Sequence, residues 1–182
     1  MTDLSDQTDN SPGTKFGKAL YAGWVALVIT GIVGGLGYTF QQPWLFPSIG
    51  PTIFIHTVTP THDSARPWNT FVGHGIGAAM AFAALTLFGA LDAPSAMTAG
   101  QVTAPRIMAS ALAVALTIGL QIPARAMHAP AMATTLLITL GGLPADFATV
   151  GVLVIGIGLS TVLCDWGRRL TSWQFGWLRN RS

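Results

Sequence analysis

Long stretches without a charged residue constrain this chain more than any other feature of its sequence. No Asp, Glu, Lys or Arg occurs in residues 19–62, 67–91, 107–124, 126–145 and 147–164. A membrane-spanning helix needs about 17–25 mainly apolar residues, and none of these stretches is shorter. Charged residues make up only 9% of the chain, against about 25% in an ordinary soluble domain. The sequence therefore predicts an all-α, polytopic membrane protein.

The same composition excludes several other classes of protein. Apolar residues make up 51% of the chain, which excludes a disordered protein. The net charge is only +2, so the sequence gives no sign of a nucleic-acid partner. The single cysteine, Cys164, cannot form an internal disulfide, which excludes a disulfide-stapled secreted domain. We expect a lipid bilayer to surround most of the chain.

Six apolar segments can be drawn within residues 19–165, which we expect to form the membrane domain. The long segments are 19–40, 70–91, 106–122 and 147–164. The shorter segments, 44–58 and 128–143, are interrupted by proline and glycine. A helix of about 16 residues is about 24 Å long, less than the ~30 Å hydrocarbon core. The two shorter segments are therefore short spans, broken helices or re-entrant segments.

The distribution of positive charge favours six crossings with both termini in the cytoplasm. In that arrangement eight of the nine Lys and Arg residues lie on the inner side, and only Arg106 lies outside. If the two short segments do not cross, four spans remain, and Arg66 and Arg125 move outside while Arg106 moves in. The count is then seven inside against two outside, a difference of one residue. Both arrangements predict a protein of the inner (plasma) membrane with cytoplasmic termini.

The order of the segments predicts a 3+3 inverted repeat. Each half of the membrane domain has a long, a short and a long segment, in that order. Because three is an odd number of crossings, the two halves have opposite orientations in the membrane. Residues 47–52 (Pro-Ser-Ile-Gly-Pro-Thr) align loosely with residues 129–134 (Ala-Pro-Ala-Met-Ala-Thr). Paired short segments interrupted by Gly and Pro are the best sequence pointer to the site of a transporter. The alternative is chance similarity among spans rich in Gly, Ala and Pro.

The two ends of the chain differ from the membrane domain. Residues 1–18 are polar and include three Asp residues, so they predict a disordered cytoplasmic tail. Within residues 166–182, three Trp residues and Leu170 share one face of a helix, and the Arg residues lie largely off that face. Because aromatic and basic residues favour the headgroup region, we expect this segment to form an amphipathic helix at the membrane interface.

Polar residues near residue 70 form the first candidate site. His74 lies inside an apolar span, and an ionisable residue there indicates a functional site by default. The alternative is a neutral histidine that is hydrogen-bonded between helices. Asn69 lies near an entrance to the membrane domain, and Arg66 and Arg125 are placed to attract an anion at such an entrance. For Arg66 we favour the alternative, a role in topology alone.

Proline begins each short segment and creates the second candidate site. Proline is favoured in the first turn of a helix, and small residues follow it here. Such helix starts would leave backbone N–H groups open to an anion. The alternative is that both are ordinary spans that begin with proline and pack closely through Gly and Ala. The candidate binding residues at the two starts are Ser48, Gly50, Thr52, His128, Pro130 and Thr134.

The sequence offers no set of residues for catalysis or for a cofactor. None of the four histidines is paired with another at a spacing of three or four residues, so no metal site is predicted. Asp92 and Asp146 lie in loops and the chain has no Glu, so no pair of carboxylates lies inside the spans. We expect a protein that is not an enzyme. Any proton coupling would fall on His74, His128 or the substrate.

At these stretches the sequence resembles the HPP family of integral membrane proteins, named for a His-Pro-Pro motif. The family motif typically reads His-Pro-Pro-Ala-Gly-Ala-Thr, and residues 128–134 here read His-Ala-Pro-Ala-Met-Ala-Thr. Ala129 and Met132 thus replace a Pro and a Gly. Residues 47–52, and residues 67–69 followed by Gly73-His74, are also similar to the family pattern. The resemblance spans roughly residues 15–165.

The resemblance implies transport, because cyanobacterial and plastid members of the family are associated with nitrite. Together with the two helix starts, it predicts a channel or carrier for a small inorganic anion, nitrite first. The expected partners are that anion and the lipid bilayer, and the sequence allows a homo-oligomer. The replacement by Met132 could narrow a passage that Gly leaves open. The alternative function is a membrane assembly or sensory subunit that transports nothing.

Overall fold

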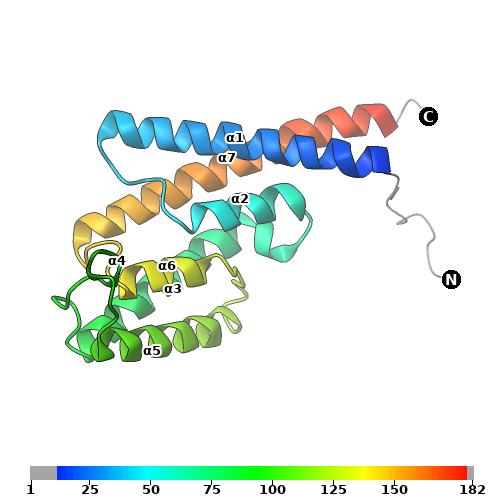
Figure 1. The fold of residues 1–182 in the computed structure, drawn as a ribbon. Helices are drawn as coiled ribbons and strands as arrows, with labels where there is room; N and C mark the ends of the chain where they lie inside the picture. The colour runs from blue at the N-terminus through cyan, green and yellow to red at the C-terminus, as the bar shows by residue number, and fades with distance from the viewer. Residues whose placement is uncertain (1–11, 180–182) are drawn as a thin grey trace.

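The computed structural model describes residues 12–179, with the side chains of residues 16–167. All regular secondary structure in that range is helical, which confirms the expected all-α fold. The elements are α1 (Pro12–Phe40), α2 (Ile49–Val58), the 3₁₀ turn η2 (Asp63–Ala65), α3 (Pro67–Leu87), α4 (Ala96–Ala99), α5 (Ala104–Gln121), α6 (Ala131–Thr139) and α7 (Phe147–Arg179) (Figure 1).

Four helices in the described part of the chain, α1, α3, α5 and α7, are long and apolar enough to cross a membrane. They correspond to the four long segments of the sequence. Helices α2 and α6 have ten and nine residues. They are therefore about 15 Å and 14 Å long, too short to cross a ~30 Å core as helices. Each follows a non-helical stretch, residues 41–48 or 122–130, so each short segment is part loop and part helix.

The chain runs back and forth between two ends of the molecule, and α1 begins at the same end where α7 finishes (Figure 1). Contacts along α5 define the path of the second short segment. The backbone N–H of His128 donates to Oε1 of Gln121, the last residue of α5. Arg106, in the first turn of α5, donates to the carbonyl of Thr139 at the end of α6. Residues 128–139 therefore run antiparallel to α5 over most of its length.

The helices form two groups of three. Helices α1, α2 and α7 pack together, α3, α5 and α6 pack together, and α3 also contacts α7. Glycine permits the closest approaches between segments. A Cβ at Gly73 of α3 would lie 3.1 Å from the carbonyl oxygen of Ala126, and one at Gly156 of α7 would lie 2.9 Å from that of Trp44. Small residues at interfaces of this kind are typical of helix packing in membranes.

The distribution of side chains fits a bilayer as the solvent. Large apolar side chains are exposed on the outer surface, including Trp24 and Leu27 of α1 and Val154 of α7. Serine, threonine and histidine side chains are buried inside. Lipid tails are as apolar as leucine, so exposed apolar surface costs little in a membrane. With the four apolar helices, this pattern identifies a membrane protein.

A buried arginine holds the end of α6. Arg106 is 3% exposed, and its guanidinium donates to the carbonyls of Ala93, Pro94 and Thr139 at 2.5, 2.8 and 2.7 Å. Carbonyls at a helix C-terminus carry partial negative charge, which compensates the buried cation. Gly141, with a φ of +79°, gives the guanidinium room, because a Cβ there would lie 2.8 Å from Nη2. The sequence identified Arg106 only as a charge that distinguishes the two topologies.

The ends of the membrane domain differ from the expected boundaries. Helix α1 begins at Pro12, so residues 12–18 belong to the first helix rather than to a disordered tail. Proline at a helix start explains this boundary. Residues 1–11 lie outside the described part of the chain. Helix α7 continues unbroken to Arg179, so the segment expected at residues 166–182 extends the last span, and its interfacial position stays a prediction. Residues 180–182 lie outside the described part.

We expect Gly73→Ala and Gly156→Ala to destabilise the protein by about 1–3 kcal/mol each, the usual cost of overpacking. The added methyl group would lie 2.8 Å from Cβ of His128 or 2.7 Å from Cε1 of Phe46. Gly75→Ala and Gly151→Ala are matched controls on the same two helices, because nothing lies within 4 Å of either added Cβ. The controls should gain up to about 1 kcal/mol from helix propensity. Thermal unfolding in detergent measures the difference, and equal effects within a pair would contradict this packing.

Candidate functional site

The starts of α2 and α6 lie against each other inside the protein. Oγ of Ser48, the residue before α2, is 2.7 Å from Oγ1 of Thr134 on α6. Oγ1 of Thr52, one turn further along, is 3.2 Å from Nε2 of His128, which precedes α6. Because the later residue of one segment meets the earlier residue of the other, the two segments are antiparallel. Their first turns overlap side by side.

Helix α3 adds a histidine between them. Nδ1 of His74 is 2.8 Å from Oγ1 of Thr134, and its Nε2 is 3.3 Å from Oγ1 of Thr52. The rings of His74 and His128 meet edge to face, with centroids 4.9 Å apart. The preceding residue, Gly73, allows this approach because any larger residue would contact His128. The Gly73-x-x-x-Gly77 spacing thus serves close packing.

We call Ser48, Thr52, His74, His128 and Thr134 the polar cluster. Each is at most 1% exposed, and each bonds at least one other member. A polar side chain inside a membrane protein is costly unless it is hydrogen-bonded, and ionisable residues there make the cluster the candidate functional site. All five were candidate binding residues in the sequence, and the structure brings them together from three separate segments.

Two residues that the sequence did not single out hold His128 in place. The carbonyl oxygen of Ser64, in η2, is 2.8 Å from Nδ1 of His128, and its Oγ is 3.3 Å away. Gln121 bridges α3 and α6, since its Nε2 donates to the carbonyl of Gly73 and its Oε1 accepts from the backbone N–H of His128. Neither residue lies in a motif. Their contacts are 64 and 7 residues away in sequence, and only the fold reveals them.

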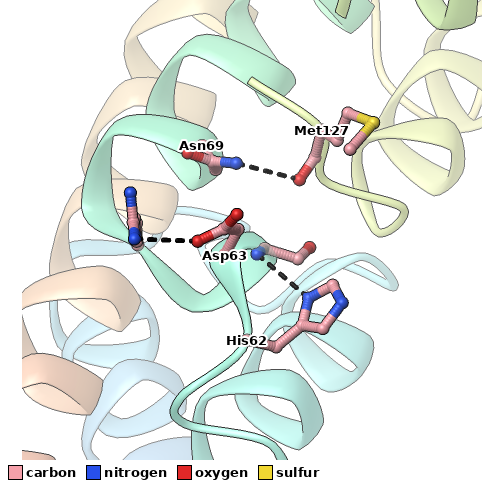
Figure 2. Close-up of polar contacts among 6 residues, drawn as sticks. His62, Asp63, Asn69 and Met127 are labelled. Carbon is pink, nitrogen blue, oxygen red and sulfur yellow. Dashed lines mark hydrogen bonds and ion pairs between the residues drawn. The ribbon is translucent and has the colours of Figure 1, made fainter. Parts of the chain in front are cut away.

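The turn that carries Ser64 is fixed by local contacts. The backbone N–H of Ser64 donates to Nδ1 of His62 at 3.1 Å, and Asp63 pairs with Arg66 at 2.9 Å (Figure 2). The side chains of this ion pair are 65% and 68% exposed. Ser64 therefore joins the buried polar cluster to an exposed polar edge. Because Arg66 already has an anionic partner, it is less available to attract a second anion than an unpaired arginine would be.

The remaining candidate residues lie beside the polar cluster rather than in it. Asn69 is buried, and its Nδ2 donates to the carbonyl of Met127, which fixes the chain next to His128 (Figure 2). Gly50 and Pro130 line a groove of about 870 Å³ between α2 and α6. Arg125 is exposed, with a φ of +48°, in the turn after α5.

One expectation about the helix starts is wrong for α6. The backbone N–H groups of Ala131, Met132 and Ala133 donate at 3.0 Å to carbonyls three residues earlier. These donors are therefore occupied by the tight turn that leads into the helix, and they are not open to an anion. The same occurs at Ile49 of α2, whose N–H donates to the carbonyl of Phe46. With these N–H groups occupied, the donors that the polar cluster offers are its side chains.

The polar cluster contains hydroxyl and imidazole groups and no carboxylate or ammonium group. Among the described residues there is also no group of three His, Cys, Asp or Glu side chains that could hold a metal ion. Neutral hydroxyls and imidazoles can each donate one hydrogen bond and accept another. The arrangement can therefore bind a small polar or anionic solute, and it can pass protons between neighbouring groups.

A double-mutant cycle tests the pairing of the two helix starts. Ser48→Ala and Thr134→Val each remove one partner of the 2.7 Å contact. The two stability losses should be non-additive by about 0.6 kcal/mol, the average for hydrogen bonds between membrane helices, and by at most about 1.7 kcal/mol. Thermal unfolding of both variants and the double variant in detergent measures this coupling. A coupling of zero would mean that Ser48 and Thr134 do not bond.

Residues 11–165 match the family model described as HPP, transmembrane region. Neither a curated protein nor a solved structure matches the chain. The matched range begins just before α1 and continues to Asp165 on α7, so it contains the whole polar cluster and nearly all of the four apolar helices. The chain belongs to the HPP transmembrane family.

Proposed function

We propose that this protein moves a small inorganic anion, nitrite first, across the inner (plasma) membrane. The observation that carries the proposal is the polar cluster, where two half-length helices start side by side and a third helix adds a histidine. Broken helices whose starts meet near a solute site are a recurring feature of transporters. Membership of the HPP family agrees with a role in membrane transport.

The donors of the polar cluster suit a small anion. The hydroxyls of Ser48, Thr52 and Thr134 can rotate to donate, and the imidazole N–H groups add further donors. Hydrogen bonds to a charged partner are worth about 1.5–3 kcal/mol each, more than those between neutral groups. No carboxylate lies in the cluster to repel the anion. An anion beside the cluster would accept hydrogen bonds from these donors as its hydration shell is lost.

The positions of the helix boundaries support an inverted repeat. Helices α2 and α6 begin at Ile49 and Ala131, which are 82 residues apart. Helices α1 and α5 end at Phe40 and Gln121, 81 residues apart, and α3 and α7 begin at positions 67 and 147, 80 residues apart. The first half of the membrane domain therefore has nearly the same spacing of elements as the second half.

The packing supports the repeat independently. If α1, α2 and α3 are exchanged with α5, α6 and α7, the group α1–α2–α7 becomes the group α5–α6–α3, and both groups exist in the fold. The close contact of Gly73 with Ala126 then becomes the contact of Gly156 with Trp44. Ala126 and Trp44 are again 82 residues apart. Chance similarity of composition would not preserve a pairwise contact of this kind.

The repeat favours six crossings over four. Each short segment combines a loop with a half-length helix, and the second one runs beside α5 from Gln121 to Arg106. That part of α5 is about 22 Å long at 1.5 Å per residue, so the second segment reaches across most of a ~30 Å core. Six crossings, like four, keep both termini on one side, and the excess of Lys and Arg there favours the cytoplasm for that side.

Cysteine labelling tests this topology. Thr61, between α2 and η2, and Pro144, before α7, are both exposed. In a chain that also carries Cys164→Ala, an impermeant thiol reagent added outside the cell should label Pro144→Cys and spare Thr61→Cys. After permeabilisation both should react. Labelling of Thr61→Cys from outside would support four spans in place of six.

Flux measurements test the site. Thr52→Val and Thr134→Val keep the side-chain shape and remove one hydroxyl each, so each should lower nitrite flux about 10- to 100-fold. Thr135→Val is the matched control, because Thr135 is equally buried on α6 and contacts Thr117 outside the polar cluster. Its flux should change much less. The assay is uptake by proteoliposomes with nitrite, nitrate, formate, chloride and neutral urea compared.

The same assay separates transport from the other function considered. An assembly or sensory subunit would give no protein-dependent flux of any of the five solutes. If all three threonine variants lost flux equally, or none did, the polar cluster would be a packing element. A flux of urea equal to that of nitrite would contradict an anion site.

A further inference from the structure

The hydrogen bonds of the polar cluster form one chain, and its direction can be worked out from one end. The carbonyl of Ser64 only accepts, and it lies 2.8 Å from Nδ1 of His128. Nδ1 of His128 must therefore carry a proton. In a neutral ring Nε2 is then an acceptor, so the hydroxyl of Thr52, at 3.2 Å, donates to it.

The next donors follow in turn. Once the Thr52 hydroxyl donates to His128, its oxygen accepts from Nε2–H of His74 at 3.3 Å. Nδ1 of His74 is then an acceptor, and Thr134 donates to it at 2.8 Å. The oxygen of Thr134 accepts from the hydroxyl of Ser48 at 2.7 Å. Every donor in the chain points from Ser48 towards Ser64, and both histidines are neutral.

A second arrangement differs from the first by one proton. The hydroxyl of Thr52 also lies 2.9 Å from the carbonyl of Ser48, one turn earlier on α2. If Thr52 donates there, Nε2 of His128 can bond the Thr52 oxygen only as an N–H donor. His128 then carries protons on both nitrogens and is an imidazolium ion. The same heavy-atom positions thus satisfy a neutral and a protonated His128, and the hydroxyl of Thr52 rotates between the two.

We propose that the polar cluster is a proton relay, in which Thr52 connects His74 to His128, and that each anion is carried together with one proton. That the proton moves together with an anion rests on the proposed function. A proton from water or from the protonated anion binds Ser48, and four transfers follow along the hydrogen bonds. At each, an O–H or N–H bond breaks as the next forms. His128 ends as the imidazolium ion, and all the other groups regain one proton each.

The far end of the relay gives the proton a way out. Oγ of Ser64 is 3.3 Å from Nδ1 of His128, and η2 carries the exposed Asp63. Release from Nδ1 through this hydroxyl to water returns His128 to a neutral ring. His128 then carries its remaining proton on Nε2, and His74 carries its proton on Nδ1. A half-turn flip of both rings, together with rotation of the hydroxyls, restores the starting arrangement. In the six-span topology this end faces the cytoplasm, so the relay runs in the direction of uptake.

The other ionisable groups around the cluster are accounted for. His56, one turn beyond Thr52 on α2, has Nε2 3.0 Å from Oγ1 of Thr70 on α3. Asp63 pairs with Arg66 at the start of α3, and Arg125 before α6 is exposed. On α5, Arg106 is bound by carbonyls at the opposite end of α6. Helix α7 carries Cys164 and Asp165 near its middle. None of them supplies a link between His74 and His128, which meet through Thr52.

Histidine NMR tests the relay directly. In ¹⁵N-labelled protein in detergent, neutral His128 should carry its proton on Nδ1 and neutral His74 on Nε2. His74→Gln and His128→Gln assign the two signals. A proton on Nε2 of neutral His128 would overturn the relay, because Thr52 would then have no acceptor in His128. This readout needs no transport and is independent of the cargo.

Proteoliposomes test the coupling. The protein-dependent initial rate of nitrite uptake is measured with a pH gradient alone and with a membrane potential alone, and the rate in protein-free vesicles is subtracted. One proton per anion makes the step electrically neutral. A gradient of one pH unit should therefore favour nitrite accumulation inside the vesicles about tenfold, which raises the initial rate of uptake. The membrane potential should have little effect on that rate. Thr52→Val should lose the response to pH, and Thr52→Ser, which keeps the hydroxyl, should retain it. Thr135→Val should retain it as well.

The outcomes separate the two proposals. Nitrite uptake driven by the potential and indifferent to the pH gradient would leave anion transport standing and overturn the relay. The relay would also be overturned by a pH response in Thr52→Val equal to that of the original protein. If no anion is transported but the histidines have the expected tautomers, anion transport would be contradicted. The hydrogen-bonded chain of the polar cluster would still be supported.

Discussion

The hydrogen bonds between the starts of α2 and α6 are the interaction on which the rest of the structure depends. Both short segments are part loop and part helix, and a polar group inside a membrane protein needs a partner within the protein because the bilayer core cannot solvate it. The contacts of Ser48 with Thr134 and of Thr52 with His128 satisfy those groups between the two segments. These bonds connect the two short segments, while α2 packs on α1 and α7, and α6 packs on α3 and α5. Helices α3 and α7 must approach closely enough to cover them, and Gly73 and Gly156 permit that approach.

The sequence predicted the helices and all five residues of the polar cluster for a physical reason. Uncharged apolar stretches have few alternatives to membrane helices, and polar residues inside them need partners. That reasoning selected His74, His128, Thr52 and Thr134 one at a time. It could not select Ser64 or Gln121, since surface-like polar residues at the ends of segments look the same whether they reach inward or face water. The sequence also could not show that the backbone N–H groups at the start of α6 are already hydrogen-bonded. They are occupied by a tight turn, and such a turn depends on backbone angles.

Arg106 shows a related limit. A positive-inside count treats every arginine as an exposed charge. In the fold this guanidinium is buried and is compensated by three carbonyls, two of them in the loop after α3 and one at the end of α6. Its position is therefore fixed by packing as well as by topology. The inverted repeat that we propose gives the stronger argument for the proposed six crossings, because it relates contacts such as Gly73 with Ala126 and Gly156 with Trp44.

The two departures from the HPP motif fall where they do not alter the polar cluster. Ala129 and Met132 line the groove on the outer side of α2 and α6. His128 and Thr134, which match the motif, are the two residues of this stretch that bond inside. A methionine in place of glycine therefore fills space on the groove side and does not narrow the cluster. Conduction needs binding that is favourable enough to admit a solute and weak enough to release it. Hydroxyls and neutral imidazoles meet that condition better than a buried lysine or arginine, whose full charge would hold an anion in a low-dielectric site.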